Sequence, residues 1–368
     1  MTMMQTFTID PDINRAETIP SWFYRSDIHF EGLKDKVFTG SWQWVGDRSL
    51  VSLETSVYPF VFMEHYLEEP MILVHDRNGQ LILLSNVCTH RGNIIVHHPG
   101  RFQKLICSYH GRRFSLEGKM EHMPEFKGTE NFPRLCDHLS QFPLLQWGPF
   151  LFTSIHPTWS LQPVIDIMQE RVGFLSLEEY RFDPSSSKDY LVHSHWALYC
   201  DNYLEGFHIP FVHKELNQIL DYGQYETVLY DYCNLQIGYG DEGSDCFDLP
   251  ANHPDFGRNI AAYYFWVFPN MMFNFYPWGL SINIVKPITK DKTRVSFLTY
   301  LPSGKILESH SQALIDKVER EDEFVVEGVH QGLKSRVYNR GRYSPKMERG
   351  VHHFHCLLEK FLFNPDCA

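Results

Sequence analysis

Two short segments that each pair a cysteine with a histidine constrain the fold of this chain more than any other feature. The first is CTHRGN at 88–93 and the second is CSYHGRR at 107–113, with sixteen residues between the histidine of the first and the cysteine of the second. Gly92 and Gly111 follow the histidines closely, and glycine permits the tight loops that such segments need. Two thiolates and two imidazoles on paired loops can close around metal, so the fold must bring these loops together.

The pattern alone leaves the kind of metal site open. Tetrahedral zinc accepts two cysteines and two histidines, and so does an iron-sulfur centre. The candidate ligands are Cys88, His90, Cys107 and His110. His97 and His98 have no cysteine at loop spacing, so we expect them to be solvated loop residues.

The surroundings of these segments predict a small antiparallel β-domain at residues 41–155. Short apolar runs alternate with turns, and Asn78-Gly79 stands between two such runs, which is typical of a two-residue β-hairpin turn. We expect the preceding segment, residues 1–40, to pack on the second domain.

Residues 156–368 predict a larger α+β domain with an antiparallel sheet flanked by helices. Helical spacing occurs in SLQPVIDIMQERVGFL and CDNYLEGFH, four strand-like stretches follow within 225–302, and 306–336 reads as one long helix. A length of 368 residues and a hydrophobic share of 43% suit a globular protein of two domains.

The longest uncharged stretch, AAYYFWVFPNMMFNFYPWGL at 261–280, is long enough to span a membrane. Pro269, Asn270, Asn274 and Pro277 interrupt it and would leave polar groups to satisfy in lipid. We therefore expect two aromatic strands joined by a turn, and no membrane partner.

Charge and cysteine usage exclude further classes of protein. The net charge of −12 and the lack of a Lys/Arg run argue against nucleic acid as a partner. The N-terminus has no secretory pattern and the eight cysteines are scattered, so we expect thiols in a reducing cytoplasm.

A second candidate site lies in HWALYCDNYLEGFHIPFVHKEL at 195–216. Glu205 and His208 are three residues apart, which predicts that they share a helix face. His213 lies five residues beyond His208, and the intervening Pro210 would let the chain bend so that both imidazoles reach one ion.

The long helix offers a third ligand. Its predicted apolar stripe consists of Ile315, Val318, Val325, Val329 and Leu333. At 100° per residue Asp322 lies within about 20° of the stripe's centre, whereas Glu319, Glu321 and Glu323 lie roughly 75° or more away. An inward carboxylate is costly unless it pairs with a cation such as arginine or binds metal. Two histidines and one carboxylate would leave positions on iron open for dioxygen and substrate.

The two sets of residues together resemble the Rieske non-haem iron oxygenases over roughly residues 41–345. The pattern Asn-x-x-acid-x-x-His-x-x-x-x-His matches Asn202, Glu205, His208 and His213, and a late aspartate matches Asp322. The resemblance implies that Cys88 and Cys107 bind one iron of a [2Fe-2S] cluster and that His90 and His110 bind the other. It also implies that His208, His213 and Asp322 bind a mononuclear Fe(II).

The resemblance further implies partners. Because the chain has no dinucleotide-binding glycine motif, a separate NAD(P)H-dependent reductase or ferredoxin must supply electrons for the reaction with dioxygen. The family assembles as a trimer in which an acidic residue, here Glu205, connects His110 of one chain with His208 of its neighbour. We therefore predict that Glu205→Ala keeps both metal centres but abolishes coupled turnover.

The C-terminal run EDEFVVEGVHQGLKSRVYNRGRYSP resembles the choline monooxygenases and related oxygenases of quaternary ammonium compounds. We therefore expect hydroxylation of a C–H bond next to nitrogen in a choline, betaine or carnitine type of substrate. Aromatic rings bind such cations well, and the candidate rings are Tyr263, Phe265, Trp266, Phe273, Phe275, Tyr276 and Trp278, of which only alternate positions can face a pocket.

Two alternatives stay open at this point: a dioxygenase that hydroxylates an aromatic ring, and a protein that only transfers electrons or binds zinc. One departure from the family is Arg112, where many members have tryptophan. We expect it to alter the surface at which an electron donor docks.

Overall fold

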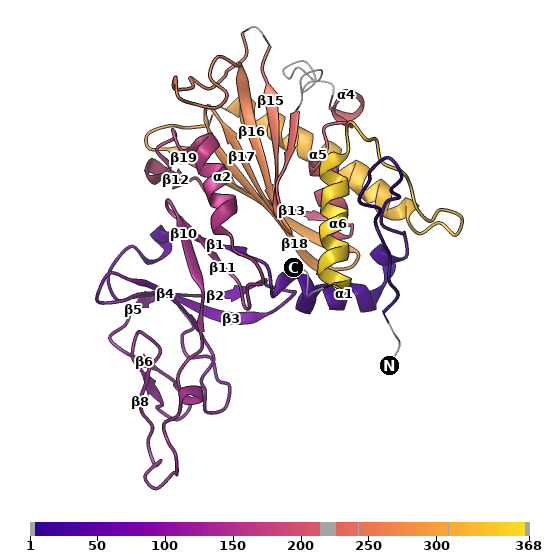
Figure 1. The fold of residues 1–368 in the computed structure, drawn as a ribbon. Helices are drawn as coiled ribbons and strands as arrows, with labels where there is room; N and C mark the ends of the chain where they lie inside the picture. The colour runs from indigo at the N-terminus through magenta and orange to yellow at the C-terminus, as the bar shows by residue number, and fades with distance from the viewer. Residues whose placement is uncertain (1–3, 214–225, 242, 308, 365–368) are drawn as a thin grey trace. The chain divides into compact units, whose positions relative to one another are not determined.

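The computed structural model describes residues 4–213, 226–241, 243–307 and 309–364 (Figure 1). The chain divides into two compact units, one formed by Met1–Ser41 with Pro157–Ala368 and the other by Trp42–His156. The α+β fold class is confirmed, with antiparallel sheets in both units and long helices in the first.

The unit of residues 42–156 consists of three small antiparallel sheets. One contains β1 (Gln43–Asp47), β11 (Phe150–Thr153) and β10 (Leu144–Trp147). The second has the order β5 (Gly100–Arg101), β2 (Ser56–Phe62), β3 (Glu69–His75), β4 (Leu81–Ser85) and β9 (Gln141–Phe142). The third contains β6 (Leu105–Ile106), β7 (Arg113–Phe114) and β8 (Met120–His122). Cys88 and Cys107 belong to the apolar core of this unit, beside Leu105, Phe114 and Leu116.

The predicted hairpin around Asn78-Gly79 is confirmed, but its turn is longer than two residues. Strands β3 and β4 pair through His75 and Leu81, and the Asp76 backbone N–H donates to the Gln80 carbonyl oxygen at 2.9 Å. The Asp76 carboxylate accepts the backbone N–H groups of Asn78 and Gln80, both at 2.8 Å, and Gly79 takes a positive φ of 80°. The Asp76 side chain thus supplies the hydrogen-bond acceptors for this longer turn. A two-residue turn would not need them.

The other unit is built on an eight-stranded antiparallel sheet. Its order is β12 (Tyr180–Phe182), β19 (Lys292–Pro302), β18 (Gly279–Thr289), β17 (Met271–Tyr276), β16 (Ile260–Val267), β15 (Cys233–Tyr239) and β14 (Glu226–Leu229), and β13 (Lys188–Val192) also pairs with β19. The stretch 261–280 thus forms aromatic strands joined by a turn, as predicted. Among the described residues no helix is long and apolar enough to cross a membrane.

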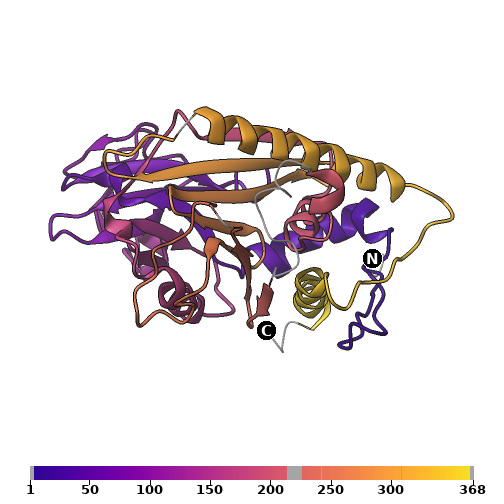
Figure 2. The same cartoon turned by 90° about the horizontal axis from the view of Figure 1, so that it is seen from above.

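Helices cover both faces of this sheet. They are α1 (Asp27–Leu33), α2 (Gln162–Val172), α3 (Trp196–Tyr203), α4 (Ile209–Val212), α5 (Ser309–Gly332) and α6 (Arg349–Phe363). Trp266 of β16 contacts Phe354 of α6, with ring centroids 5.2 Å apart. The neighbouring Tyr263 faces the other way, toward Asp255, which also pairs with Arg171 of α2. The long helix α5 runs alongside the sheet (Figure 2).

The N-terminal segment lies against α6. The Ile9 backbone N–H donates to the Glu359 carboxylate at 2.7 Å, and the rings of Phe7 and Phe363 lie 5.1 Å apart edge to face. Residues near the start and the end of the chain therefore form one packed layer.

Candidate functional site

The two Cys/His segments fold into loops with the same backbone hydrogen bonds. Loop 88–93 is closed by the antiparallel bridge between Val87 and Ile94, and loop 107–112 by the pair of Ile106 and Arg113. In each loop the cysteine N–H donates to the carbonyl oxygen five residues later, at 2.8 and 2.9 Å. The cysteine carbonyl oxygen accepts the glycine N–H four residues later, at 2.9 and 3.0 Å, and both glycines have a φ of 73°.

This construction brings the four candidate ligands together. The thiols of Cys88 and Cys107 are buried close to each other, and the rings of His90 and His110 lie 4.8 Å apart. The Nδ1 atom of His90 is buried and has no hydrogen-bond partner within the described parts of the chain. A buried polar atom without a partner is costly unless it binds a ligand, so these residues fit a metal centre with Cys₂ on one side and His₂ on the other.

The electrostatic surroundings differ between the two thiols. Burial raises the pKa of the Cys88 thiol. Burial acts on Cys107 in the same direction, but hydrogen bonds from the backbone of Tyr109 and from the Asn93 side chain hold its pKa below the ordinary value. The Asn93 Nδ2 atom lies 3.5 Å from Cys107 Sγ. Donors aimed at sulfur favour the thiolate, which is the form that binds metal.

The expectation that Arg112 alters a docking surface is wrong. The residue is buried, with 1% of its surface exposed, and its guanidinium pairs with the Asp137 carboxylate at 2.8 Å. The ion pair with Asp137 and two flanking aromatic rings lower the cost of burying this charge.

The second candidate site begins where α3 ends. The prediction that Glu205 and His208 share a helix face is wrong, because α3 ends at Tyr203 and α4 begins only at Ile209. The two side chains meet because Glu205 folds back over the next turn. Its Oε2 atom accepts the backbone N–H groups of Phe207 and His208, and its Oε1 atom bonds His208 Nδ1 at 2.7 Å.

Pro210 stands in the first turn of α4, and His213 follows the helix's last residue. The predicted restart of the chain is thus observed, and it directs both imidazoles toward α5. His213 is 2% exposed.

The three candidate ligands of the mononuclear site meet at the Asp322 carboxylate. Its Oδ1 atom lies 3.0 Å from His213 Nε2 and 3.4 Å from His208 Nε2. One ligand atom each of His208, His213 and Asp322 can be chosen so that all lie within 4.8 Å of one another. The Asn202 Nδ2 atom donates to the same Oδ1 atom at 2.7 Å. The three candidate ligands and Asn202 therefore meet at one oxygen atom, and Glu205 joins them through its bond to His208.

The charges at this point favour a cation. Burial opposes protonation of His208, but hydrogen bonds to Asp322 and Glu205 raise its pKa to about 9. Burial acts against ionisation of Asp322 as well, yet its hydrogen bonds to His208 and His213 hold its pKa below the ordinary value. Asp322 and Glu205 thus stabilise positive charge on the His208 imidazole. They would in the same way stabilise a metal ion bound by the Nε2 atom of His208.

Two acidic residues of α5 were assigned wrongly to the outer side of the helix. Glu319 is buried, at 8% exposure, and accepts the hydroxyl of Tyr199. Glu321 bonds His213 Nδ1 at 2.8 Å, as Glu205 does for His208. The predicted stripe was centred incorrectly, because Val329 is 46% exposed whereas Val326 and His330 are each 2% exposed.

Cross-strand register decides which aromatic residues lie on the α3 side of the sheet. Gln236, Tyr264, Asn274, Ser281 and Thr299 are successive partners on β15 to β19, so they form one row on one face. This face lies toward α3, because the hydroxyl of Tyr203 donates to Asn274 Oδ1 at 2.7 Å and the Gln236 amide donates to the Tyr203 carbonyl oxygen.

Of the predicted aromatic candidates, Trp266 and Tyr276 share this face by strand alternation, and Trp278 stacks on Tyr276 at 4.8 Å. The others, Tyr263, Phe265, Phe273 and Phe275, point to the opposite face and are at most 1% exposed.

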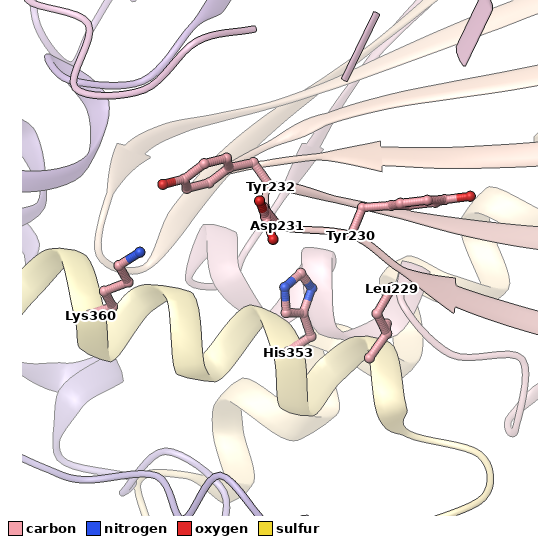
Figure 3. Close-up of a pocket in the computed structure, with 6 residues that line it drawn as sticks. All are labelled: Leu229, Tyr230, Asp231, Tyr232, His353 and Lys360. Atoms are coloured by element: carbon pink, nitrogen blue, oxygen red, sulfur yellow. The ribbon is translucent and has the colours of Figure 1, made fainter. Parts of the chain in front are cut away.

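A pocket of about 510 Å³ lies elsewhere in this unit (Figure 3). It is lined by Leu229, Tyr230, Asp231, Tyr232, His353 and Lys360, and none of the predicted site residues is among them. Lys360 Nζ lies over the ring of Tyr232, 5.6 Å from its centroid, and His353 bonds Asn234 at 2.8 Å. These polar groups already have partners within the fold, so we assign this pocket no part in the site.

Both halves of the chain match known protein families. Residues 41–133 match the Rieske [2Fe-2S] domain, and residues 177–362 match the catalytic domain of the ring-hydroxylating alpha subunit. The chloroplastic choline monooxygenase of Arabidopsis thaliana is 31% identical over 95% of this chain and 84% of its own length.

Two further comparisons point the same way. The carnitine monooxygenase oxygenase subunit of Escherichia coli K12 is 26% identical over 96% of both chains. The crystal structure of the quaternary ammonium Rieske monooxygenase CntA in complex with L-carnitine has the same fold, with a TM-score of 0.77, 21% identity and coverage of 97% of this chain and 99% of that one.

Proposed function

We propose that this chain, which belongs to the Rieske-type ring-hydroxylating oxygenases, is the oxygenase component of a monooxygenase that hydroxylates a C–H bond next to nitrogen in a quaternary ammonium or N-methyl compound. The observation that carries the oxygenase part is the convergence of His208, His213 and Asp322 in a chain that also has the paired Cys/His loops. Like its relatives, the chain acts on O2 and a small molecule and needs a reductase partner.

We assign the cofactors to residues as follows. Residues 41–155 form the electron-transfer domain, where Cys88 and Cys107 hold one iron and His90 and His110 the other. Residues 156–368 form the catalytic domain, on which residues 1–40 pack, and its mononuclear iron is held by His208, His213 and Asp322. When bound, the cluster supplies electrons singly and the iron(II) activates dioxygen.

The chain's own residues prepare the iron site. Glu205 and Glu321 each accept from the Nδ1 atom of one histidine, which fixes the ring and directs Nε2 toward Asp322. Asn202 donates to Asp322 and orients its carboxylate. Such partners of metal ligands commonly account for a 10- to 100-fold difference in metal affinity.

The surroundings support a cationic substrate. Glu205, Glu319, Glu321 and Asp322 place four carboxyl groups around the two histidines or one helical turn away. The rings of Tyr276 and Trp278 stack on the sheet face that α3 covers, and aromatic faces attract quaternary ammonium groups without hydrogen bonds. An aromatic acid, the substrate of the alternative ring-hydroxylating activity, would meet repulsion from Asp322 and the other ionised carboxylates. Glu319 adds little to this repulsion, because burial raises its pKa well above the ordinary value.

We further propose that the chain works as a homotrimer in the cytoplasm, with Glu205 connecting His208 to His110 of a neighbouring chain. Apolar side chains near the site support a contact between chains, since Phe211 is 74% and Phe324 is 81% exposed. Phe211 also lies beside the exposed ring of Phe207, with centroids 6.2 Å apart, and exposed apolar side chains that lie together mark contact surfaces.

The test combines metal analysis with a substrate panel. Purified protein should contain iron near three per chain together with acid-labile sulfide, and should show the visible and paramagnetic spectra of a Rieske centre. With a reductase present, choline, betaine, carnitine and an aromatic acid are compared for oxygen uptake and formaldehyde or aldehyde release. Zinc without colour would refute the oxygenase function, and turnover of the aromatic acid alone would refute the substrate class.

A further inference from the structure

Arg112, the last residue of the second cluster loop, is a buried cation. Its side chain is 2% exposed, its guanidinium lies over the rings of Phe114 and Phe132 at 5.7 and 5.4 Å, and its Nη2 atom donates to Asp137. Its Nε atom is buried with no partner in the described ranges of the chain. Because burial of an incompletely bonded cation costs free energy, its presence needs an explanation beyond packing.

The two loops show what is particular about Arg112. Asn93 and Arg112 occupy the same position, since the carbonyl oxygen of each accepts the N–H of its loop's cysteine. The Asn93 side chain turns inward and donates to Cys107 Sγ, whereas that of Arg112 pairs with Asp137. The Asp137 carbonyl oxygen also accepts the Thr89 hydroxyl of the first loop at 2.8 Å, so both loops are tied to this ion pair.

Arg112 lies close to ligands of both loops. Its own carbonyl oxygen accepts the Cys107 N–H, and its partner Asp137 accepts the hydroxyl of Thr89, which stands between Cys88 and His90. Solvent screens a charge that is this deeply buried much less than it screens an exposed one, so the field of the guanidinium extends to the neighbouring cluster site.

We propose that Arg112 raises the reduction potential of the [2Fe-2S] cluster by placing a permanent, buried positive charge at the end of the loop that carries Cys107 and His110. Reduction adds one negative charge to the cluster, and a nearby cation stabilises that charge. This role rests on the proposed function, because it requires the cluster. The ion pair with Asp137 positions the guanidinium and moderates its effect.

The experiment is a redox titration of the full-length holoprotein at one fixed pH, followed by the paramagnetic signal of the reduced cluster. Arg112→Gln removes the charge, Arg112→Lys keeps it, and Arg91→Gln is the matched control because Arg91 is an exposed arginine of the first loop. We expect Arg112→Gln to lower the equilibrium constant for reduction on the order of tenfold, which is about 59 mV for a one-electron couple. Arg91→Gln should shift the potential by less than a third of this, and Arg112→Lys should retain most of the wild-type potential.

An unchanged potential in Arg112→Gln with an intact cluster signal would overturn the proposal, and so would an equal shift in Arg91→Gln. If Arg112→Gln does not retain its cluster, the reduction potentials of Asp137→Asn and Arg112→Lys test the proposal instead. Asp137→Asn removes the opposing charge and must raise the potential, while the lysine variant must stay near wild type, and failure of either result refutes the role. A wild-type protein that contains zinc and no cluster would refute the proposed function itself, which the wild-type spectrum reveals before any variant is measured.

Discussion

The contacts of Glu205 make its replacement the most informative test of the iron site. One carboxylate accepts three donors, His208 Nδ1 at 2.7 Å and the backbone N–H groups of Phe207 and His208. Glu205→Gln keeps the length of the side chain but leaves one acceptor oxygen. The amide can therefore serve the imidazole or the backbone, but not both.

The expected loss follows from this count. A hydrogen bond to a charged group contributes about 1.5–3 kcal/mol, and a lost backbone cap costs about 1 kcal/mol. Because one of these hydrogen bonds orients the His208 imidazole, the substitution also weakens iron binding. We expect the affinity for the mononuclear iron to drop about 10- to 100-fold, as is common for partners of metal ligands. Glu205→Ala removes all three contacts, so the earlier expectation that it keeps the iron holds only when iron is supplied in excess.

The assay separates iron affinity from electron transfer. Iron is first titrated into each apo-site in the presence of a competing chelator, and turnover is then measured at saturating iron as product formed per O2 consumed. Glu321→Gln is the matched control, because Glu321 bonds His213 Nδ1 in the same way but has no proposed contact with a second chain. Both variants should bind iron more weakly, and Glu205→Gln alone should lose coupled turnover at full occupancy. Normal product formation by iron-saturated Glu205→Gln, or equal loss in both variants, would refute the bridging role.

Three further predictions concern other parts of the structure. Asp322→Ala should lower the iron content from about three to about two per chain while the cluster spectrum stays unchanged, because Asp322 contacts only the histidines of the mononuclear site. Loss of the cluster signal would contradict this separation of the two metal sites. Gly92→Ala should destabilise the first loop by about 1–2 kcal/mol. The cost comes from the φ of 73° alone, because no atom lies within 4 Å of the added methyl group. A melting curve of the holoprotein that is unchanged from wild type would contradict this prediction. His195 is buried and its folded pKa is lowered to about 3, so the unfolded chain binds a proton first and stability falls as the pH drops below about 6.5. Between pH 6.5 and 5 the loss is about 2 kcal/mol, and urea midpoints of His195→Asn, which keeps an acceptor at the start of α3, should depend less on pH over this range than those of wild type.

Strands, helices and candidate ligands were predictable because each depends on local pattern. The alternation of β16 and β17, the turn at Pro269 and the helix that carries Asp322 all follow from spacing along the chain. The grouping of His208, His213 and Asp322 followed once a helix position was combined with a family pattern.

The errors arose where a side chain overrides local spacing. Helix α3 stops before Glu205 because that carboxylate is used by the backbone of the next turn. The buried side of α5 is displaced because Tyr199 on α3 gives Glu319 a partner in the interior, and no pattern within α5 records a partner 120 residues away. Arg112 could not be placed from its own segment, since Asp137 lies 25 residues further along the chain.

The two faces of the large sheet have separate tasks. Tyr263, Phe265, Phe273 and Phe275 fill one face and account for much of its apolar packing. The opposite row from Gln236 to Thr299 takes one polar or amphipathic side chain from each of five strands. Since neighbours in a strand point in opposite directions, a substitution in that row leaves the apolar layer intact. Selection could thus alter the face that α3 covers one strand at a time without repacking the opposite layer, provided that the hydrogen-bond partners of that row remain satisfied.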